Sequence, residues 1–106
     1  MIFKIRISER AENDIRAIYR YIAYDIGAPE AAARLIGRIE TGIRSLDEMP
    51  ERYRAYHRES LRKRGLRVMP VENYLIFYIP DKETQTVSIV RVIYKGRDVE
   101  KQLTEE

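Results

Sequence analysis

Residues 65–97 constrain the fold more than any other stretch, because they hold three short apolar runs separated by tight turns. The runs are Leu66–Val71, Tyr74–Ile79 and Thr86–Tyr94, and the third is rich in β-branched residues. Parallel neighbours would need a crossover of about a dozen residues or more, and these runs lie much closer together in the chain. The sequence therefore predicts a three-stranded antiparallel meander.

The first half of the chain predicts one strand and then two helices. Apolar and polar residues alternate over 2–7, as in a half-buried strand, and Ser8 follows as a helix N-cap. Apolar residues then recur at helical spacing in two stripes: Ala11, Ile15, Ile18 and Ile22, and Leu35, Ile39, Ile43 and Leu46. The first helix should end near residue 24 and the second should run over 29–47. Their short connection at Gly27 predicts an antiparallel hairpin.

These elements predict a single α+β domain over residues 1–106, with both helices packed on one face of the sheet. The opposite face should be open, and the tail after Gly96 should form one or two helical turns. In the last strand both alternating sets are apolar, which predicts a central position; Val87, Ile89 and Ile93 form one set. Arg91 interrupts that set, so we expect it to face a groove or to meet a carboxylate.

The composition excludes several kinds of site. There is no cysteine, and no apolar run approaches the ~20 residues that cross a bilayer, so we expect a cytoplasmic protein with no membrane contact. No Gly-rich phosphate loop, metal-ligand cluster or Ser–His–Asp arrangement occurs in the sequence. We therefore expect no cofactor and no metal. The single histidine, His57, is expected at the surface, and most of the eight tyrosines are expected to be structural.

Positive charge is concentrated just before the predicted meander. Residues 52–67 contain seven basic residues and a single acidic one, Glu59. The basic residues are Arg52, Arg54, Arg58, Arg62, Lys63, Arg64 and Arg67. Such a concentration attracts polyanions or an acidic protein segment. An ordinary solvated loop is the alternative.

The order of these elements and their amino-acid sequences resemble those of a known family. The stretches "RKRGLRVMPVENYLIFYIPD" and "VSIVRVIYKGRDVEKQL" resemble the RelE/ParE superfamily of toxins from type II toxin–antitoxin modules, and "APEAAARLIGRIETGIRSLDEMPERY" resembles the second helix of that family. The resemblance implies a toxin with a helical hairpin on a twisted antiparallel sheet. It also implies a cognate antitoxin as partner, in a toxin–antitoxin hetero-oligomer.

The superfamily divides by target. RelE-like members cut mRNA on the translating ribosome, and for that activity the candidates would be Arg67, Tyr94 and Arg97. Leu75 follows Tyr74 where those members carry Arg, and no Tyr or His follows Arg97. The ending "RVIYKGRD" looks more like the ParE branch, whose members bind DNA gyrase without catalysis.

Target- or antitoxin-binding candidates are Arg62, Lys63, Arg64, Arg91, Lys95 and Arg97. Gly96 would let the backbone approach a partner closely between Lys95 and Arg97. Arg67 and Arg91 could instead pair with an internal acid such as Glu72 or Asp98. A nucleic-acid-binding module without toxicity is a further alternative, which requires only the basic stretch.

Overall fold

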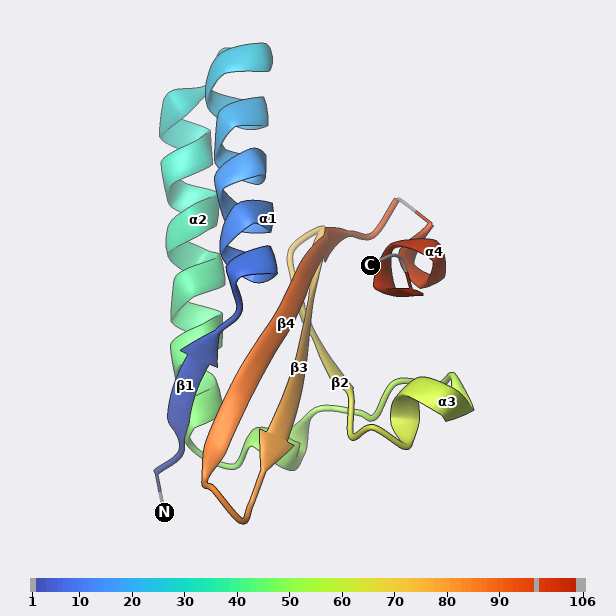
Figure 1. Ribbon diagram of the computed structural model, residues 1–106. Helices are drawn as coiled ribbons and strands as arrows, with labels where there is room; N and C mark the ends of the chain where they lie inside the picture. The colour runs from blue at the N-terminus through green and yellow to red at the C-terminus, as the bar shows by residue number, and fades with distance from the viewer. Residues whose placement is uncertain (1, 97, 105–106) are drawn as a thin grey trace.

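The computed structural model describes residues 2–96 and 98–104, without the side chains of residues 60 and 61. Its main elements, in chain order, are β1 (Lys4–Ile7), α1 (Glu9–Arg20), α2 (Pro29–Arg44), β2 (Arg67–Val71), β3 (Tyr74–Asp81), β4 (Thr86–Tyr94) and α4 (Val99–Thr104) (Figure 1). Short helical segments complete the connections: η1 (Tyr21–Asp25), η2 (Ser45–Asp47), η3 (Pro50–Arg52) and α3 (Glu59–Arg62). The α+β prediction is confirmed.

The four strands form one mixed sheet in the order β1-β4-β3-β2. β2, β3 and β4 make the antiparallel meander, and β1 pairs with β4 in parallel. The helical hairpin supplies the long crossover that a parallel pair requires. β4 therefore has a strand on each side, which confirms the central position that its two apolar faces predicted.

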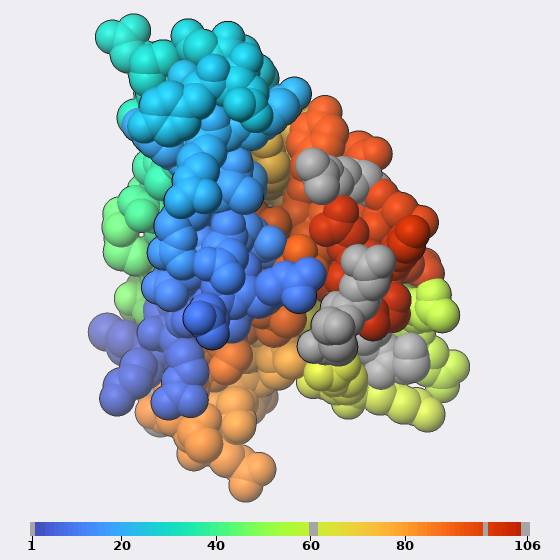
Figure 2. Space-filling model, turned by 45° about the horizontal axis from the view of Figure 1, so that its top comes forward, coloured from blue at the N-terminus to red at the C-terminus, as the bar shows by residue number. Residues whose placement is uncertain are grey.

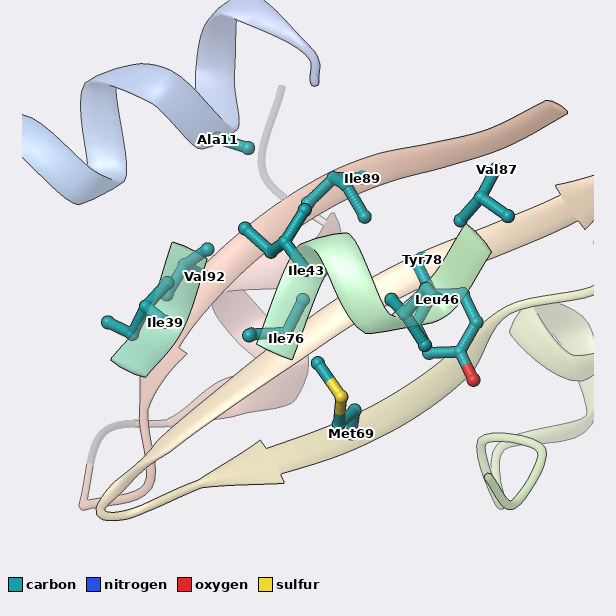
Figure 3. Packing of buried hydrophobic residues seen from close by; sticks show 10 residues of the cluster. All are labelled: Ala11, Ile39, Ile43, Leu46, Met69, Ile76, Tyr78, Val87, Ile89 and Val92. Carbon is teal, nitrogen blue, oxygen red and sulfur yellow. The ribbon is translucent and has the colours of Figure 1, made fainter. Parts of the chain in front are cut away.

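The α1–α2 hairpin covers one face of the sheet. Ser8 begins α1 as the N-cap, and its Oγ accepts a hydrogen bond from the backbone N–H of Ala11 at 3.0 Å. Below the hairpin lies a cluster of buried residues from helices and strands, shown in Figure 3: Ala11, Ile39, Ile43, Leu46, Met69, Ile76, Tyr78, Val87, Ile89 and Val92. The two apolar stripes of the helices thus point into the core, as their spacing predicted, except for Ile22 at the end of the first stripe, which is not part of this cluster.

The opposite face of the sheet is also covered, so the expectation of a bare face is wrong. A second cluster of buried residues lies there: Tyr56, Leu66, Val68, Phe77 and Ile93. Part of this cover comes from the connection before β2, and part from α4, whose Val99 and Leu103 pack against the cluster. The four-residue spacing of that pair was sufficient to predict a helical turn but not the surface that it covers.

A β-bulge in β4 changes which of its residues share a face. The register between β3 and β4 shifts after Phe77, and Val90 is the extra residue on β4. Strict alternation predicted Ile93 on the same face as Val87. Beyond the bulge the alternation is offset by one residue, so Val92 lies in the cluster under the helices and Ile93 in the second cluster.

β1 is shorter than β4, and where β1 ends, the backbone of β4 is hydrogen-bonded instead by a residue of α1 and by its N-cap, Ser8. β1 ends opposite Ile89, whose carbonyl oxygen accepts a hydrogen bond from the Ser8 backbone N–H at 3.0 Å. The Ser8 hydroxyl donates to the carbonyl oxygen of Val90 at 3.1 Å, and the N–H of Val92 donates to Asp14 Oδ2 at 2.9 Å. Two side chains thus replace the missing strand, which fixes α1 against the end of β4.

Candidate functional site

A groove of about 800 Å³ runs between the outer part of the helical hairpin and the end of the sheet. We call it the hairpin groove. Figure 2 looks toward it, between the blue helical hairpin and the orange and red C-terminal part of the chain. Apolar residues of the hairpin form one wall: Ile18, Tyr21, Ile22, Ile26 and Leu35. Residues from β3, β4 and the turn after β4 form the other: Tyr74, Val92, Ile93, Tyr94 and Gly96.

The charges in the hairpin groove are mostly paired within the protein. Five charged residues line it, and Arg38 of α2 forms an ion pair with Glu72 in the β2–β3 turn. Asp14 forms a second ion pair with Arg91 at 2.8 Å. Arg34 remains exposed and has no acidic partner in the part of the chain that the structure describes. The groove therefore combines an apolar wall with one unpaired positive charge.

Large apolar side chains are exposed at the end of the hairpin and in the lining of the groove. The exposed fractions are 55% for Tyr21, 73% for Tyr24, 58% for Ile26 and 45% for Tyr94. The first three belong to the end of the hairpin, where η1 is a π-helical turn closed by the Ile26 N–H donating to the Tyr21 carbonyl oxygen at 2.9 Å. Such clustered exposure is typical of an interaction surface. Of these residues only Tyr94 was a candidate from the sequence; Tyr21, Tyr24 and Ile26 were not, although Tyr21 and Tyr24 lie off the apolar stripe of the first helix.

The turn after β4 holds Lys95, one of the expected site residues. The Lys95 backbone N–H donates to the Asn73 carbonyl oxygen at 2.8 Å, and Lys95 is exposed. A Cβ added to Gly96 would lie 2.5 Å from Tyr94 Cε2, so the glycine admits the tyrosine ring, which also contacts the Tyr74 ring at a centroid distance of 5.5 Å. Arg97, a candidate under both the RelE-like and the ParE-like alternative, lies outside the described residues.

Arg91 is buried and bound by an acid, which is one of the two outcomes expected for it. It is only 8% exposed. Its Nε and one terminal nitrogen donate to the two carboxylate oxygens of Asp14 at 2.8 and 3.1 Å, and the other terminal nitrogen donates to the Gln102 carbonyl oxygen at 2.9 Å. The partner is neither Glu72 nor Asp98, so that part of the expectation is wrong. The side chain joins α1, β4 and α4.

Arg67 lies at the other end of the sheet. Its guanidinium donates to the backbone carbonyl oxygens of Glu51 at 3.2 Å and Tyr53 at 2.6 Å. Arg67 is opposite Tyr78 on β3, whereas Tyr94 is opposite Tyr74. Four residues of extended strand place Arg67 and Tyr94 roughly 13 Å apart along the sheet. The structure therefore does not bring these two candidates into one site.

The cationic stretch forms a projecting arm, residues 54–67, which we call the basic arm (Figure 1). Its two ends run antiparallel: the Tyr56 N–H donates to the Leu66 carbonyl oxygen at 2.9 Å, and the Ala55–Arg67 pair forms an isolated bridge. Between them lie α3 and a turn closed at Gly65, whose φ is 84°. Arg62, Lys63 and Arg64 are exposed at the tip, which is a folded arm and not a plain loop.

Burial raises the pKa of two tyrosines, and neither lies in the hairpin groove. Burial raises the pKa of Tyr78 to about 12, against the opposing effect of Arg67, and the Tyr78 hydroxyl donates to the Pro50 carbonyl oxygen at 2.6 Å. Burial, reinforced by Glu100, also raises the pKa of Tyr56. Both phenols are thereby kept protonated in structural positions. His57 is exposed, as expected, with its Nε2 3.7 Å from Glu100.

Within residues 2–96 and 98–104, no three His, Cys, Asp or Glu side chains gather as they would around a metal ion. In the same ranges no helix has the length and apolar character needed to cross a bilayer. In that part of the chain, exposed apolar residues or unpaired charges occur on three surfaces: the hairpin groove, the turn after β4 and the basic arm. These surfaces are the candidates for binding a partner.

Several solved structures share this fold, including the following three. The chromosomal ParDE toxin–antitoxin system of P. aeruginosa matches with a TM-score of 0.71 and 19% identity over 88% of this chain and 96% of that one. The toxin–antitoxin complex RelBE2 of Mycobacterium tuberculosis matches with a TM-score of 0.62 and 22% identity over 89% and 99% of the two chains. A mutant of the E. coli toxin RelE in its free state matches with a TM-score of 0.67 and 11% identity over 96% and 93%.

At the sequence level the evidence comes from a family model. No curated protein matches the sequence. The model of the ParE toxin of type II toxin–antitoxin systems matches residues 5–99, from β1 to the start of α4. Because that match spans nearly the whole chain, and the fold agrees with it, the protein belongs to the ParE family of toxins of type II toxin–antitoxin systems.

Proposed function

We propose that this toxin acts by binding and inhibiting DNA gyrase, and that it does not cleave mRNA. The observation that carries this proposal is the separation of Arg67 from Tyr94. Cleavage of RNA needs a general base, a general acid and a stabiliser of phosphate charge within hydrogen-bond reach of one phosphate group. Arg67 is bound to two carbonyl oxygens at the far end of the sheet, roughly 13 Å from Tyr94 along the strands.

For contact with gyrase we propose the turn after β4. Lys95 presents its charge there, and Arg97 follows it in the sequence. Arg91 enters the proposal as a positioning residue, because it is bound to Asp14 and to Gln102 of α4 and fixes the strand that ends in this turn. Arginine and lysine suit such a contact because both bind carboxylates and phosphates.

The partner that neutralises the toxin is proposed to be a cognate antitoxin bound in the hairpin groove. Two of the structural neighbours are toxin–antitoxin systems. An amphipathic segment could place apolar residues on the Tyr21 and Ile26 wall and a carboxylate near Arg34. Folding of such a segment on binding would cover a large surface, at some expense in affinity.

The experiment compares two readouts on the purified toxin. Gyrase supercoiling and gyrase-dependent DNA cleavage are measured with increasing toxin, and mRNA cleavage is measured by primer extension on translating ribosomes. We expect inhibition of supercoiling with accumulation of cleaved DNA, and intact transcripts. The variant Lys95→Ala should inhibit gyrase more weakly than wild type, whereas Lys101→Ala, which removes an exposed lysine from α4, should not. Codon-specific cuts with unaffected supercoiling would overturn the proposal.

A further inference from the structure

The basic arm carries more positive charge than its surroundings neutralise. Within the described residues, three acids form ion pairs in or beside the region, and each already has a cation: Glu51 lies 3.3 Å from Lys82, Glu59 lies 3.6 Å from Lys63, and Glu100 pairs with Arg58. Two further arginines, Arg52 and Arg67, donate to backbone carbonyl oxygens. Three remain without an acidic or hydrogen-bonding side-chain partner in the described part of the chain: Arg54, Arg62 and Arg64.

These three arginines belong to one continuous structure. Arg54 lies where the arm leaves the edge of the sheet, since its carbonyl oxygen accepts a hydrogen bond from the Val68 N–H at 3.2 Å. Arg62 ends α3, and Arg64 lies in the turn that leads back to β2. All three are exposed. Arginine carries a permanent charge and a planar fork of donors, which suits phosphate oxygens.

The one tyrosine of the arm is turned away from solvent, and the exposed ring of His57 lies against it at a centroid distance of 4.5 Å. Tyr56 is 5% exposed and its ring lies against Phe77 at a centroid distance of 5.6 Å. Tyr53, which precedes the arm, is half-buried, and the guanidinium carbon of Arg52 lies 4.9 Å from the centroid of the Tyr53 ring. Proteins that bind single-stranded nucleic acid use exposed aromatic rings to stack on bases. An arm that exposes several guanidinium groups and buries its one tyrosine fits the phosphate backbone of a duplex better.

We propose that the basic arm binds the phosphate backbone of double-stranded DNA through Arg54, Arg62 and Arg64. This inference rests on the proposed function, since it assigns to the toxin a contact with the DNA that gyrase holds. The binding is independent of sequence, because phosphates carry no base information. The arm and the turn after β4 would then act on different components of the gyrase–DNA complex.

The direct test measures binding of the purified toxin to a fluorescent DNA duplex of about 20 base pairs while the salt concentration is varied. A variant with Arg54→Gln, Arg62→Gln and Arg64→Gln loses three phosphate contacts, so the slope of log affinity against log salt should decrease by about 2.7 in magnitude. Between about 50 and 200 mM salt the wild type should therefore lose about 40-fold more affinity than the variant does.

Two controls separate this site from bulk charge. Replacing Arg6, Arg10 and Arg20 by Gln removes three exposed arginines that lie outside both the arm and the hairpin groove, and this variant should retain most of the wild-type slope. Replacing the three arm arginines by Lys keeps the charges and should also retain it. An equal loss in the Arg6, Arg10 and Arg20 variant, or tighter binding of a single-stranded or duplex RNA of the same sequence, would overturn the proposal.

Gyrase assays distinguish the failure of this inference from failure of the proposed function. If both hold, the arm variant binds gyrase without DNA as the wild type does but traps less cleaved DNA. If the wild type leaves gyrase active and still binds duplex DNA through the arm, the arm site stands without the gyrase target. If the wild type inhibits gyrase but arm substitutions change neither DNA binding nor trapping, the arm site is wrong and the target stands.

Discussion

The ion pair between Asp14 and Arg91 should be among the most sensitive side-chain interactions in the protein. Both side chains are nearly buried, with exposed fractions of 13% and 9%, and Asp14 also accepts the Val92 N–H. Replacing Asp14 by Ala leaves a buried guanidinium and a strand N–H without their acceptor. We expect a loss of about 3–5 kcal/mol in the free energy of unfolding, measured by urea denaturation.

The matched control is Glu12→Ala, which removes an exposed carboxylate from the same helix. It should change the free energy of unfolding by less than about 0.5 kcal/mol. Equal effects of the two substitutions would show that Arg91 does not depend on Asp14. The ion pair also affects how Arg91 variants are interpreted. If it stabilises the fold, an Arg91 variant would lose toxicity because the protein unfolds, and not because a contact with the target is lost.

Tyr78 should make the stability of the protein depend on pH above 10. Its pKa is raised from 10.0 to about 12 because the phenolate is disfavoured in the core. The stabilisation is complete below the unfolded pKa and is lost as the pH rises through the folded one, so wild type should lose about 2–3 kcal/mol between pH 10 and 12 from this group.

The variant Tyr78→Phe lacks this titration but also lacks the hydrogen bond to the Pro50 carbonyl oxygen. At pH 7 it should therefore be less stable than wild type by about 1–2 kcal/mol. Chemical denaturation at a series of pH values should show the difference shrinking above pH 10 and vanishing or changing sign by pH 12, because the loss expected for wild type is at least as large as the deficit of the variant at pH 7. A difference that stays constant across that range would contradict the pKa shift.

At the scale of the helix, α2 contains two glycines with opposite expected roles. A Cβ at Gly37 meets nothing within 4 Å, whereas one at Gly42 would lie 3.1 Å from Val71 and 3.2 Å from Met69. Gly37→Ala should raise the free energy of unfolding by about 0.5–1 kcal/mol, since glycine is a poor helix former. Gly42→Val should lower it by about 1–3 kcal/mol by forcing α2 away from β2. Thermal unfolding of both variants checks the pair, and equal shifts would contradict the close contact.

The elements that local pattern could predict are those with a clear period. The helical stripes and the runs of the meander gave the correct elements because apolar spacing alone determines which face of a helix or strand is buried. The bulge at Val90 of β4 could not be predicted, since one inserted residue reverses the alternation without any local signal. As a consequence Val92 and Ile93 were assigned to the wrong faces.

The candidate site was less predictable because it depends on contacts between distant residues. Asp14 and Arg91 are 77 residues apart, and no spacing rule connects them. The cover of the second sheet face joins Tyr56 to Val99 and Leu103, which were each too isolated in the sequence to indicate a core. The surplus of positive charge before β2 was evident from the sequence, whereas which arginines are unpaired depends on the fold.

For the molecule as a whole, the helical wall of the hairpin groove and the turn after β4 should serve different partners. The hairpin wall presents Tyr21 with 55% exposure and the unpaired Arg34, whereas Lys95 lies beyond the end of β4. An antitoxin bound along the hairpin wall would bury Tyr21 and place a carboxylate near Arg34. Changes in this wall should therefore reduce neutralisation more than they reduce inhibition of gyrase.

The variants Tyr21→Ala and Arg34→Glu test this separation. Loss of a buried tyrosine anchor should weaken antitoxin binding by about 10- to 30-fold, and the reversed charge should repel the acidic segment. The antitoxin is sought as the product of a short reading frame beside the toxin gene, and binding is measured by calorimetry. Arg10→Glu makes the same charge reversal on α1 outside the groove and should be neutralised normally. Each substitution removes one contact that this wall offers to the antitoxin. If the antitoxin rescues cells that express either groove variant as fully as it rescues cells that express the wild-type toxin, antitoxin binding does not depend on this wall.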